Sequence, residues 1–253
     1  MSTQEPDIMG PFVEKLRKTY EDRGGVSCDD LVGDEILGSD RLIRELVFSL
    51  LMWEASIAHA VKAAARISEE LVDLNELRVC TPEELVGIIG PRYPRGLDRA
   101  RRLTAVLTRI FHTENRLSLA VLGEMNKRDV LEYFARIDGI PPFAANRVIL
   151  LGLGWHAFPV DERLAKLLAG KDIADSSLDI AQQTQRLERM VRASEAKEYY
   201  TLIEHWSQSQ RTPRSGSRAG SGSGTRSGSG SGSGKPETST DPQEAGSPAK
   251  GAS

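Results

Sequence analysis

Cysteine and histidine are scarce in this sequence, which narrows the kinds of site that it can build. Cys28 and Cys80 are the only cysteines, and they lie far apart without a C-x-x-C pair. This excludes a disulfide framework and a four-cysteine zinc site, and it favours reduced thiols inside a cell. The four histidines show no ligand spacing and no matching carboxylates, so we predict no metal site.

Long apolar runs, strand patterns and nucleotide-binding motifs are also missing. The longest apolar run is far too short to span a bilayer, and no leader-like segment opens the chain, so we expect no membrane contact. Gly152 and Gly154 mark a helix end rather than a dinucleotide-binding or phosphate-binding loop. No stretch shows the alternation of apolar and polar residues that is typical of a strand. We therefore expect an all-α fold.

The end of the chain differs in composition from the rest. From Ser207 onward it consists mainly of Ser, Gly, Arg, Thr and Pro, and neither an aromatic residue nor an aliphatic one larger than Ala follows Trp206. Such a segment buries too little apolar surface to offset its ordering entropy. We therefore predict a folded domain over residues 1–206 and a disordered Ser/Gly-rich tail over residues 207–253.

The net charge of −3 is divided unevenly between these two parts. The segment from Arg211 to the end holds six of the 33 basic and three of the 36 acidic residues, which leaves 27 basic and 33 acidic residues before it. The folded part is therefore acidic, and in bulk it is a poor partner for nucleic-acid phosphates, although a local basic patch can still bind them. The basic tail either adds loose phosphate contacts or serves only as a solubilising linker.

Apolar residues recur at helical spacing through most of the folded part. Thr81 and Pro82 mark one helix start, with Thr as N-cap and Pro in the first turn, and Gly90 marks its end. Over residues 21–38, Gly, Asp, Ser and Cys interrupt any period, and we predict a loop there. The predicted helical segments are residues 11–20, 41–54, 57–67, 81–90, 91–111, 127–137, 143–151, 162–168, 178–194 and 197–206.

The stretch over residues 137–161, IDGIPPFAANRVILLGLGWHAFPVD, carries the densest set of turn and helix signals. Gly139 marks a first turn, and the two prolines after it fix φ where a helix begins. Gly154 follows the apolar stripe of that helix and ends it. Asp161 stands directly before the next apolar pattern, ERLAKLL, and so lies at a helix N-terminus. Together with the helix predicted before it, this is a helix-hairpin-helix pattern.

These residues resemble a segment of the endonuclease III family of helix-hairpin-helix DNA glycosylases. The family's segment runs Leu-Pro-Gly-Val-Gly-x-Lys-x-Ala-Asn, then an apolar helix, then Gly-Trp and a Val-Asp pair. The resemblance extends over about residues 41–206, and it implies an all-α fold of two helical lobes with a groove between them. It also implies that Asp161 is the catalytic residue of N-glycosidic bond cleavage. The residues that match in kind, without a gap, are Gly139, Ile140, Ala145, Asn146, Gly154, Trp155, Val160 and Asp161.

This sequence departs from the family pattern at positions that matter for chemistry. The second hairpin glycine of the family is Pro141 here, which has no N–H to offer a phosphate. The lyase lysine of the family is Phe143 here, which cannot form a Schiff base, so we predict an enzyme without lyase activity. The family often carries an iron–sulfur cluster on four cysteines after its last helix. The Ser/Gly-rich tail takes that place here, and we predict no cofactor.

The resemblance also implies which residues face DNA. Hairpin amides of the family hold a DNA phosphate, and a Gln of the family fills the gap that the extruded base leaves, at the position of Glu54. A basic segment over residues 91–111 matches a family helix rich in Lys and Arg, and it would flank the groove. The predicted DNA contacts are Glu54, Arg99, Arg102, Gly139, Ile140, Phe143, Ala144 and Arg147.

Each of these assignments has a plain structural alternative. Asp161 can serve only as a helix N-cap, although capping and catalysis are compatible. Glu54 can be a helix-end carboxylate that faces solvent. The basic segment over residues 91–111 can be no more than a solvated helix face. For Trp53, a place in the core is favoured over a role as a base-stacking platform.

The function that the resemblance implies is DNA base-excision repair. A monofunctional DNA N-glycosylase would flip a damaged base out of double-stranded DNA and hydrolyse its N-glycosidic bond. We expect a monomer in the cytoplasm, associated with the nucleoid if the source is bacterial. The alternative is a DNA-binding or scaffold protein that retains the glycosylase fold without activity, which Glu54, Pro141 and Phe143 suggest.

Overall fold

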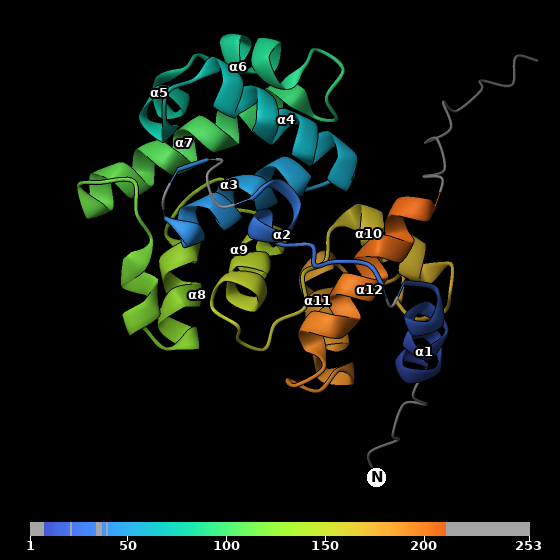
Figure 1. The fold of residues 1–253 in the computed structure, drawn as a ribbon. Helices are drawn as coiled ribbons and strands as arrows, with labels where there is room; N and C mark the ends of the chain where they lie inside the picture. Colours follow the sequence, from blue (N-terminus) through green and yellow to red (C-terminus); the bar gives the residue numbers. More distant parts are fainter. Residues whose placement is uncertain (1–7, 21, 34–36, 39, 211–253) are drawn as a thin grey trace, which may run out of the picture. The chain divides into compact units, whose positions relative to one another are not determined.

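The computed structural model describes residues 8–20, 22–33, 37–38 and 40–210, and no strand occurs within them. The all-α prediction is confirmed, and the tail from Arg211 onward lies outside the described residues (Figure 1). The helices, in chain order, are α1 (Met9–Tyr20), α2 (Cys28–Val32), α3 (Arg41–Met52), α4 (Ile57–Glu70), α5 (Leu74–Val79), α6 (Pro82–Ile89), α7 (Gly96–Glu114), the 3₁₀ helix η1 (Ala120–Glu124), α8 (Lys127–Ala135), α9 (Pro142–Arg147), the π-helix η2 (Val148–Gly152), α10 (Glu162–Ala169), α11 (Ile180–Met190) and α12 (Ala196–Ser209).

Two short α-helices, and the 3₁₀ helix η1, were not predicted from the sequence. Helix α2 lies inside the predicted loop, where Ser27 and Asp30 form a reciprocal capping box at its start. Helix α5 follows Asp73, whose side chain accepts hydrogen bonds from the N–H groups of Asn75 and Glu76. Both helices are too short to show an apolar period, so only their caps could have indicated them.

The predicted boundary after Trp206 is wrong, because α12 continues to Ser209. Ser207 is buried, and Gln208 accepts a hydrogen bond from the N–H of Ile57 at 2.9 Å, at the start of α4. These polar residues carry no apolar signal, and they are ordered by partners that lie far away in the sequence.

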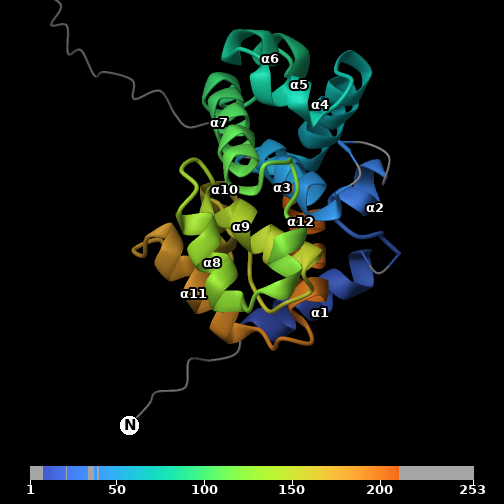
Figure 2. The ribbon, with the colours of Figure 1, turned by 90° about the vertical axis from the view of Figure 1, so that its left-hand side faces the viewer.

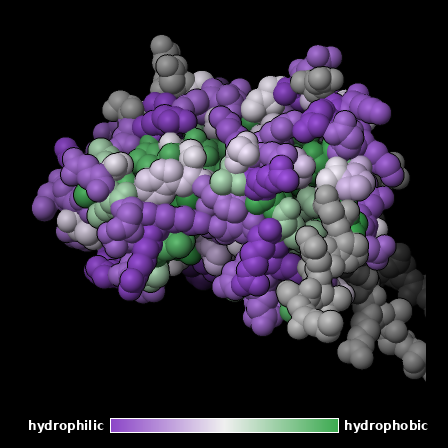
Figure 3. Space-filling view, turned by 90° about the horizontal axis from the view of Figure 1, so that it is seen from below, coloured by the Kyte–Doolittle hydropathy of each residue, from purple (hydrophilic) through white to green (hydrophobic). Residues whose placement is uncertain are grey.

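Helix α3 lies at the centre of the fold. Figures 1 and 2 show α4 to α7 on one side of it and α8 to α12 with α1 on the other. Every residue of α3 from Ile43 to Met52 is buried, and the helix contacts α4, α7, α9 and η2. The face in Figure 3 is mostly hydrophilic with small separate apolar areas. Among the described residues, no helix is long and apolar enough to cross a membrane.

Arg147 is a buried connector with no exposed surface, which corrects its assignment as a DNA contact. Its Nη2 atom lies 3.0 Å from Oε1 of Glu45, and its Nε donates to Oγ of Ser49 at 3.0 Å, both on α3. Its Nη1 donates to the hydroxyl of Tyr200 on α12 at 2.6 Å, and Nη2 donates to the carbonyl of Val26 at 2.6 Å. One guanidinium therefore ties α9 to α3, α12 and the segment before α2.

Removal of the Arg147 charge alone should strongly destabilise the fold. Arg147→Leu leaves Glu45 buried without its cation, and we expect a loss of about 3–5 kcal/mol in the free energy of unfolding, measured by urea denaturation. Arg147→Leu combined with Glu45→Leu should recover part of that loss, since no buried charge then remains unpaired. Arg109→Leu, at an exposed position, is the control. A single variant as stable as this control would contradict the structural role.

Candidate active site

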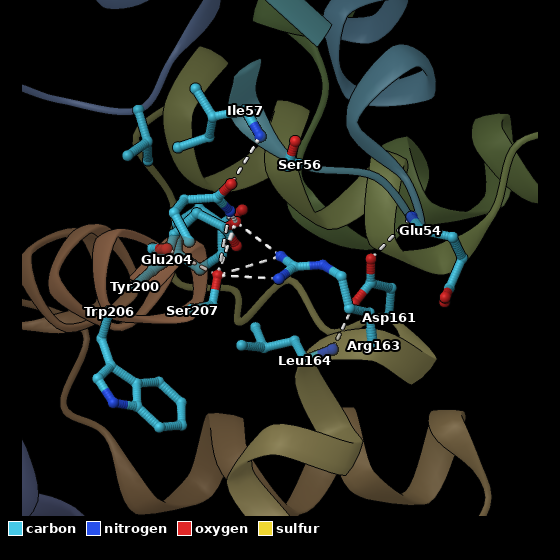
Figure 4. A network of polar contacts seen from close by, with 12 residues as sticks. Glu54, Ser56, Ile57, Asp161, Arg163, Leu164, Tyr200, Glu204, Trp206 and Ser207 are labelled. Carbon is cyan, nitrogen blue, oxygen red and sulfur yellow. Dashed lines mark hydrogen bonds and ion pairs between the residues drawn. The ribbon is translucent and has the colours of Figure 1, made fainter. Parts of the chain in front are cut away.

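Asp161 is a buried N-cap that also holds a second segment. Its Oδ1 accepts a hydrogen bond from the N–H of Leu164 at 2.7 Å, which caps α10 and confirms the capping prediction. Its Oδ2 accepts a hydrogen bond from the N–H of Glu54 at 2.8 Å, across 107 residues of sequence (Figure 4). The residue is only 2% exposed. Both carboxylate oxygens are therefore engaged with backbone N–H groups.

Glu54 completes a reciprocal contact with α10. It lies in the turn between α3 and α4 with a φ of +54°, a left-handed conformation that costs a non-glycine residue roughly 1 kcal/mol. Its Oε1 accepts a hydrogen bond from the N–H of Glu162 at 2.6 Å, in the first turn of α10. The carboxylate is thus bound to the protein and is neither a free gap-filling side chain nor a freely solvated one. Insertion of Glu54 into a DNA gap would first require its release from α10.

Arg99 supports this turn from within the core, so its assignment as a DNA contact is corrected. Its guanidinium donates to the carbonyls of Leu50, Leu51 and Trp53 at the end of α3, with a distance of 2.8 Å to Leu51. The side chain is fully buried. Burial lowers the pKa of Arg99 to about 10, which leaves it charged at neutral pH. Arg99 thus supplies donors to carbonyls at the end of α3, where carbonyls have no partner within the helix.

Trp53 is part-exposed and packs against the hydrophobic core, as predicted, and its ring also contacts cations. The guanidinium carbons of Arg95 and Arg102 lie 4.3 Å and 4.6 Å from its ring centroid. Asp98 forms ion pairs with both arginines, at 2.9 Å and 3.0 Å. Arg102 also donates to the carbonyl of Gly139 at 3.3 Å. This contact brings the hairpin turn next to the segment that carries Trp53 and Glu54.

The hairpin offers fewer free N–H groups than the sequence suggested. Gly139 has a φ of +100°, and a Cβ there would lie 3.3 Å from Val106 of α7, so the turn requires glycine. The N–H of Ile140 donates within the turn, and that of Ala144 donates to the carbonyl of Pro141 at 2.9 Å. Of the four predicted donors, Ile140 and Ala144 are therefore already occupied by protein acceptors. Gly139 remains a predicted donor.

Phe143 is the fourth of the predicted backbone donors. Phe143 is the second residue of α9, so its N–H, unlike that of Ala144, has no carbonyl of the same helix to donate to, and this donor stays a prediction. Its side chain is buried, 2% exposed, and forms part of the apolar core.

Burial and neighbouring charges set the electrostatics of Asp161. Burial raises the pKa of this carboxyl group to about 6, the Arg163 guanidinium opposes the rise, and the Glu54 carboxylate adds to it. Arg163 is held by Glu204 at 2.8 Å and by the Ser207 hydroxyl at 3.1 Å, both on α12. Asp161 can therefore exchange a proton near neutral pH, and above pH 6 it is mainly an anion.

The sequence did not indicate Arg163 and Glu204 as part of this site. Figure 4 shows the Arg163 side chain extending from beside Asp161 toward Glu204 and Ser207 on α12. One signal was present, because Glu204 and Ser207 share a helix face with Tyr200 and Ile203, and all four are buried. A carboxylate on an apolar face needs a buried partner, and an arginine is the usual one.

Comparison with known proteins identifies the fold. Neither a protein-family model nor a curated protein matches the sequence. Solved structures do match, among them a trapped endonuclease III–DNA covalent intermediate, with a TM-score of 0.58 and 15% identity over 80% of this chain and 86% of that chain. An H. pylori 3-methyladenine DNA glycosylase bound to 1,N6-ethenoadenine matches with a TM-score of 0.56 and 12% identity, covering 80% and 99%.

A thermostable thymine-DNA glycosylase matches with a TM-score of 0.54 and 14% identity over 82% of this chain and 89% of that chain. The chain therefore has the helical fold of the endonuclease III-like helix-hairpin-helix DNA glycosylases. The all-α glycosylase fold that the resemblance implied is confirmed.

Neutralisation of Glu54 should lower the pKa of Asp161. Glu54→Gln keeps an oxygen that can accept the N–H of Glu162, yet it removes the negative charge that raises the pKa of Asp161. The titration can be followed by ¹³C NMR of the Asp161 carboxyl carbon. Glu162→Gln is the matched control, because this exposed side chain pairs with Lys166 and is not among the causes of the shift. An unchanged pKa in Glu54→Gln would refute the electrostatic coupling.

Proposed function

We propose that this protein excises damaged bases from DNA as a monofunctional glycosylase, with Asp161 as the catalytic carboxylate. The observation that carries the proposal is a buried carboxylate with a pKa of about 6, at the N-terminus of α10 and hydrogen-bonded to the turn that carries Glu54. The fold supports it at a coarser level, because the similar solved structures are DNA glycosylases. The segment over residues 137–161 supplies the matching motif.

The chemistry of the step suits such a carboxylate. Cleavage of an N-glycosidic bond develops positive oxocarbenium charge on the sugar, which a nearby anion stabilises. Each oxygen of Asp161 accepts one N–H group, so each keeps a lone pair for a water molecule or for the sugar face. In the proposed reaction, the anionic form orients the attacking water and accepts its proton, while the base departs with the bonding electrons.

Access to Asp161 requires a local opening. The residue is 2% exposed, and the turn that carries Glu54 lies against it. We propose that DNA displaces the Glu54 carboxylate from α10, which would uncover Asp161 and free the Glu54 side chain at the same time. The reciprocal contact would then close the site when no DNA is bound.

The second candidate function is a DNA-binding or scaffold protein that keeps the fold without activity. The burial of Asp161 and the engagement of both of its oxygens favour this alternative, since a pure N-cap would look the same. Pro141 and Phe143 point in the same direction, because they replace a hairpin donor and the lyase lysine of the family pattern. A panel of duplexes, each with one lesion, separates the two functions by abasic-site formation.

Asp161→Asn should abolish base release while leaving a folded protein. Asparagine has one acceptor oxygen, so one of the two N–H contacts is lost together with the charge. Wild-type activity should rise with pH through about 6, as Asp161 ionises. The measurement is base release from the lesion panel across a pH series. Equal release by wild type and variant would rule out Asp161 as the catalytic group, and binding without release by both would favour the scaffold alternative.

The stability of the Asp161→Asn variant tests the raised pKa of Asp161 without a measurement of activity. The pKa of Asp161 is higher in the folded state than the ordinary value of 3.8, so ionisation favours the unfolded state. Wild-type stability should therefore fall relative to the variant as the pH rises from about 4 to about 6, and the difference should stay constant above that range. Urea denaturation of both proteins at each pH measures this difference in the free energy of unfolding. A constant difference between the two proteins across pH 4 to 7 would show that Asp161 is not perturbed.

No covalent adduct with DNA should form under borohydride. Phe143 stands where the family has its lyase lysine, and its buried side chain cannot form a Schiff base. The assay incubates the protein with lesion-containing duplex and borohydride and looks for a protein–DNA species on a denaturing gel. A lyase-competent endonuclease III serves as the positive control. A trapped species would mean that a lysine outside the hairpin reaches the sugar.

A further inference from the structure

A cavity of about 460 Å³ lies between α4 and the turn that joins α6 to α7, outside the site around Asp161. Basic side chains from both elements line it. Helix α4 contributes His59, Lys62 and Arg66, and the turn contributes Arg92. No acidic residue is among the lining residues. In a folded part with more acidic than basic residues, a cavity lined by one sign of charge is an unusual feature.

The cations of this cavity lack protein counterions. Lys62 and Arg92 form no hydrogen bond or ion pair with their side chains within the described part of the chain. Arg66 donates only a long hydrogen bond of 3.4 Å, to the carbonyl of Ile89. Lys62 and Arg66 are four residues apart on one helix, a spacing at which like charges repel. An anion in the cavity would relieve that repulsion.

Another cavity of similar size, about 440 Å³, provides a contrast. It contains Arg17 and Glu198, and this arginine is paired with both Glu198 and Glu14 at 2.8 Å and 2.6 Å. Arg17 is therefore satisfied by the protein itself, and this cavity, which Arg23 and Lys197 also line, includes the acidic side chain of Glu198. The cavity beside α4 differs because no acidic residue lines it, and guanidinium and ammonium groups are the side chains that bind phosphate best.

The cavity shares a rigid support with the candidate active site. Tyr93 lines it and donates its hydroxyl to the carbonyl of Leu51 at 2.7 Å. The same carbonyl accepts a hydrogen bond from Arg99, which also holds the carbonyl of Trp53 next to Glu54. Helix α4 begins at Ile57, directly after this turn. The cavity and the Glu54 turn are thus fixed to the same end of α3.

The basic residues of α4 form a stripe whose length can be compared with the spacing of phosphates along DNA. His59, Lys62 and Arg66 occupy successive turns of one helix face, and seven residues of helix span about 10 Å. Neighbouring phosphates of one DNA strand advance by about 3.4 Å along the duplex axis, so the stripe covers roughly three steps.

We propose that the cavity beside α4 binds backbone phosphates of the DNA that occupies the site around Asp161. The proposal rests on the proposed function for the identity of the nucleic acid. Lys62 and Arg92 donate to phosphate oxygens, and Arg66 contributes its remaining N–H groups. The hairpin offers few free amides, and this cavity adds phosphate contacts in a fold that is acidic in bulk.

The salt dependence of binding to undamaged duplex tests the proposal without any base release. Lys62→Gln with Arg92→Gln removes two contacts, and Arg109→Gln with Lys171→Gln is the matched control at exposed positions with the same change in net charge. Each phosphate contact adds a factor of roughly 3.5 to the loss of affinity between 50 and 200 mM salt. The wild type should therefore lose roughly 12-fold more affinity over this range than the Lys62/Arg92 variant, while the control should match the wild type.

Titration with inorganic phosphate distinguishes the two possible sources of the anion, which are the DNA backbone and free phosphate. Inorganic phosphate is titrated into each protein while the amide NMR signals of Gly90 and Arg92 are recorded, and urea denaturation verifies that the variants remain folded. Lower salt dependence in the Lys62/Arg92 variant alone supports a DNA contact. Phosphate-dependent signals with unchanged salt dependence mean a site for free phosphate and overturn the proposal.

Equal salt dependence in all three proteins, without phosphate-dependent signals, also overturns the proposal. Lower salt dependence in a protein that releases no base from any lesion keeps the phosphate site and removes the glycosylase assignment. The phosphate site beside α4 and the glycosylase activity can therefore be refuted independently of each other.

Discussion

The carboxylate of Asp161 joins the two chain segments on which the candidate site depends. One oxygen caps α10, and the other holds the turn between α3 and α4. Glu54 returns the contact by binding the first turn of α10 with its own carboxylate. Arg99 fixes the turn from the core side through the last carbonyls of α3. The position of Asp161, its burial and its raised pKa all follow from this arrangement.

Burial divides the arginines of this protein into two kinds with different tasks. Arg99 and Arg147 are completely buried, and they bind carbonyls, a carboxylate and hydroxyls inside the protein. Arg102 is only part-buried and contacts Trp53 and the hairpin turn. Arg92 is exposed beside the cavity next to α4. Only arginines of the second kind can meet an external phosphate, so a count of basic residues overstates the surface that is available for DNA.

Much of the fold could be predicted from the sequence, because long helices carry an apolar period and strong caps. Thr81 and Pro82 begin α6, and Asp161 caps α10, as the residue types indicated. The short helices α2 and α5 escaped prediction, since they depend on caps alone. The end of α12 escaped it for another reason. Its last polar residues are ordered by contacts with the start of α4, and local composition contains no trace of such contacts.

The sequence by itself determined the all-α class, the hairpin turn at Gly139 and the acidic cap at Asp161, because backbone geometry and capping are local properties. Only the tertiary structure decided which charges are buried. The partner of Asp161 lies 107 residues away at Glu54, and that of Arg147 lies 102 residues away at Glu45. A charged residue has the same local pattern whether it faces solvent or a buried partner. Its role is therefore settled by the residues that folding brings next to it.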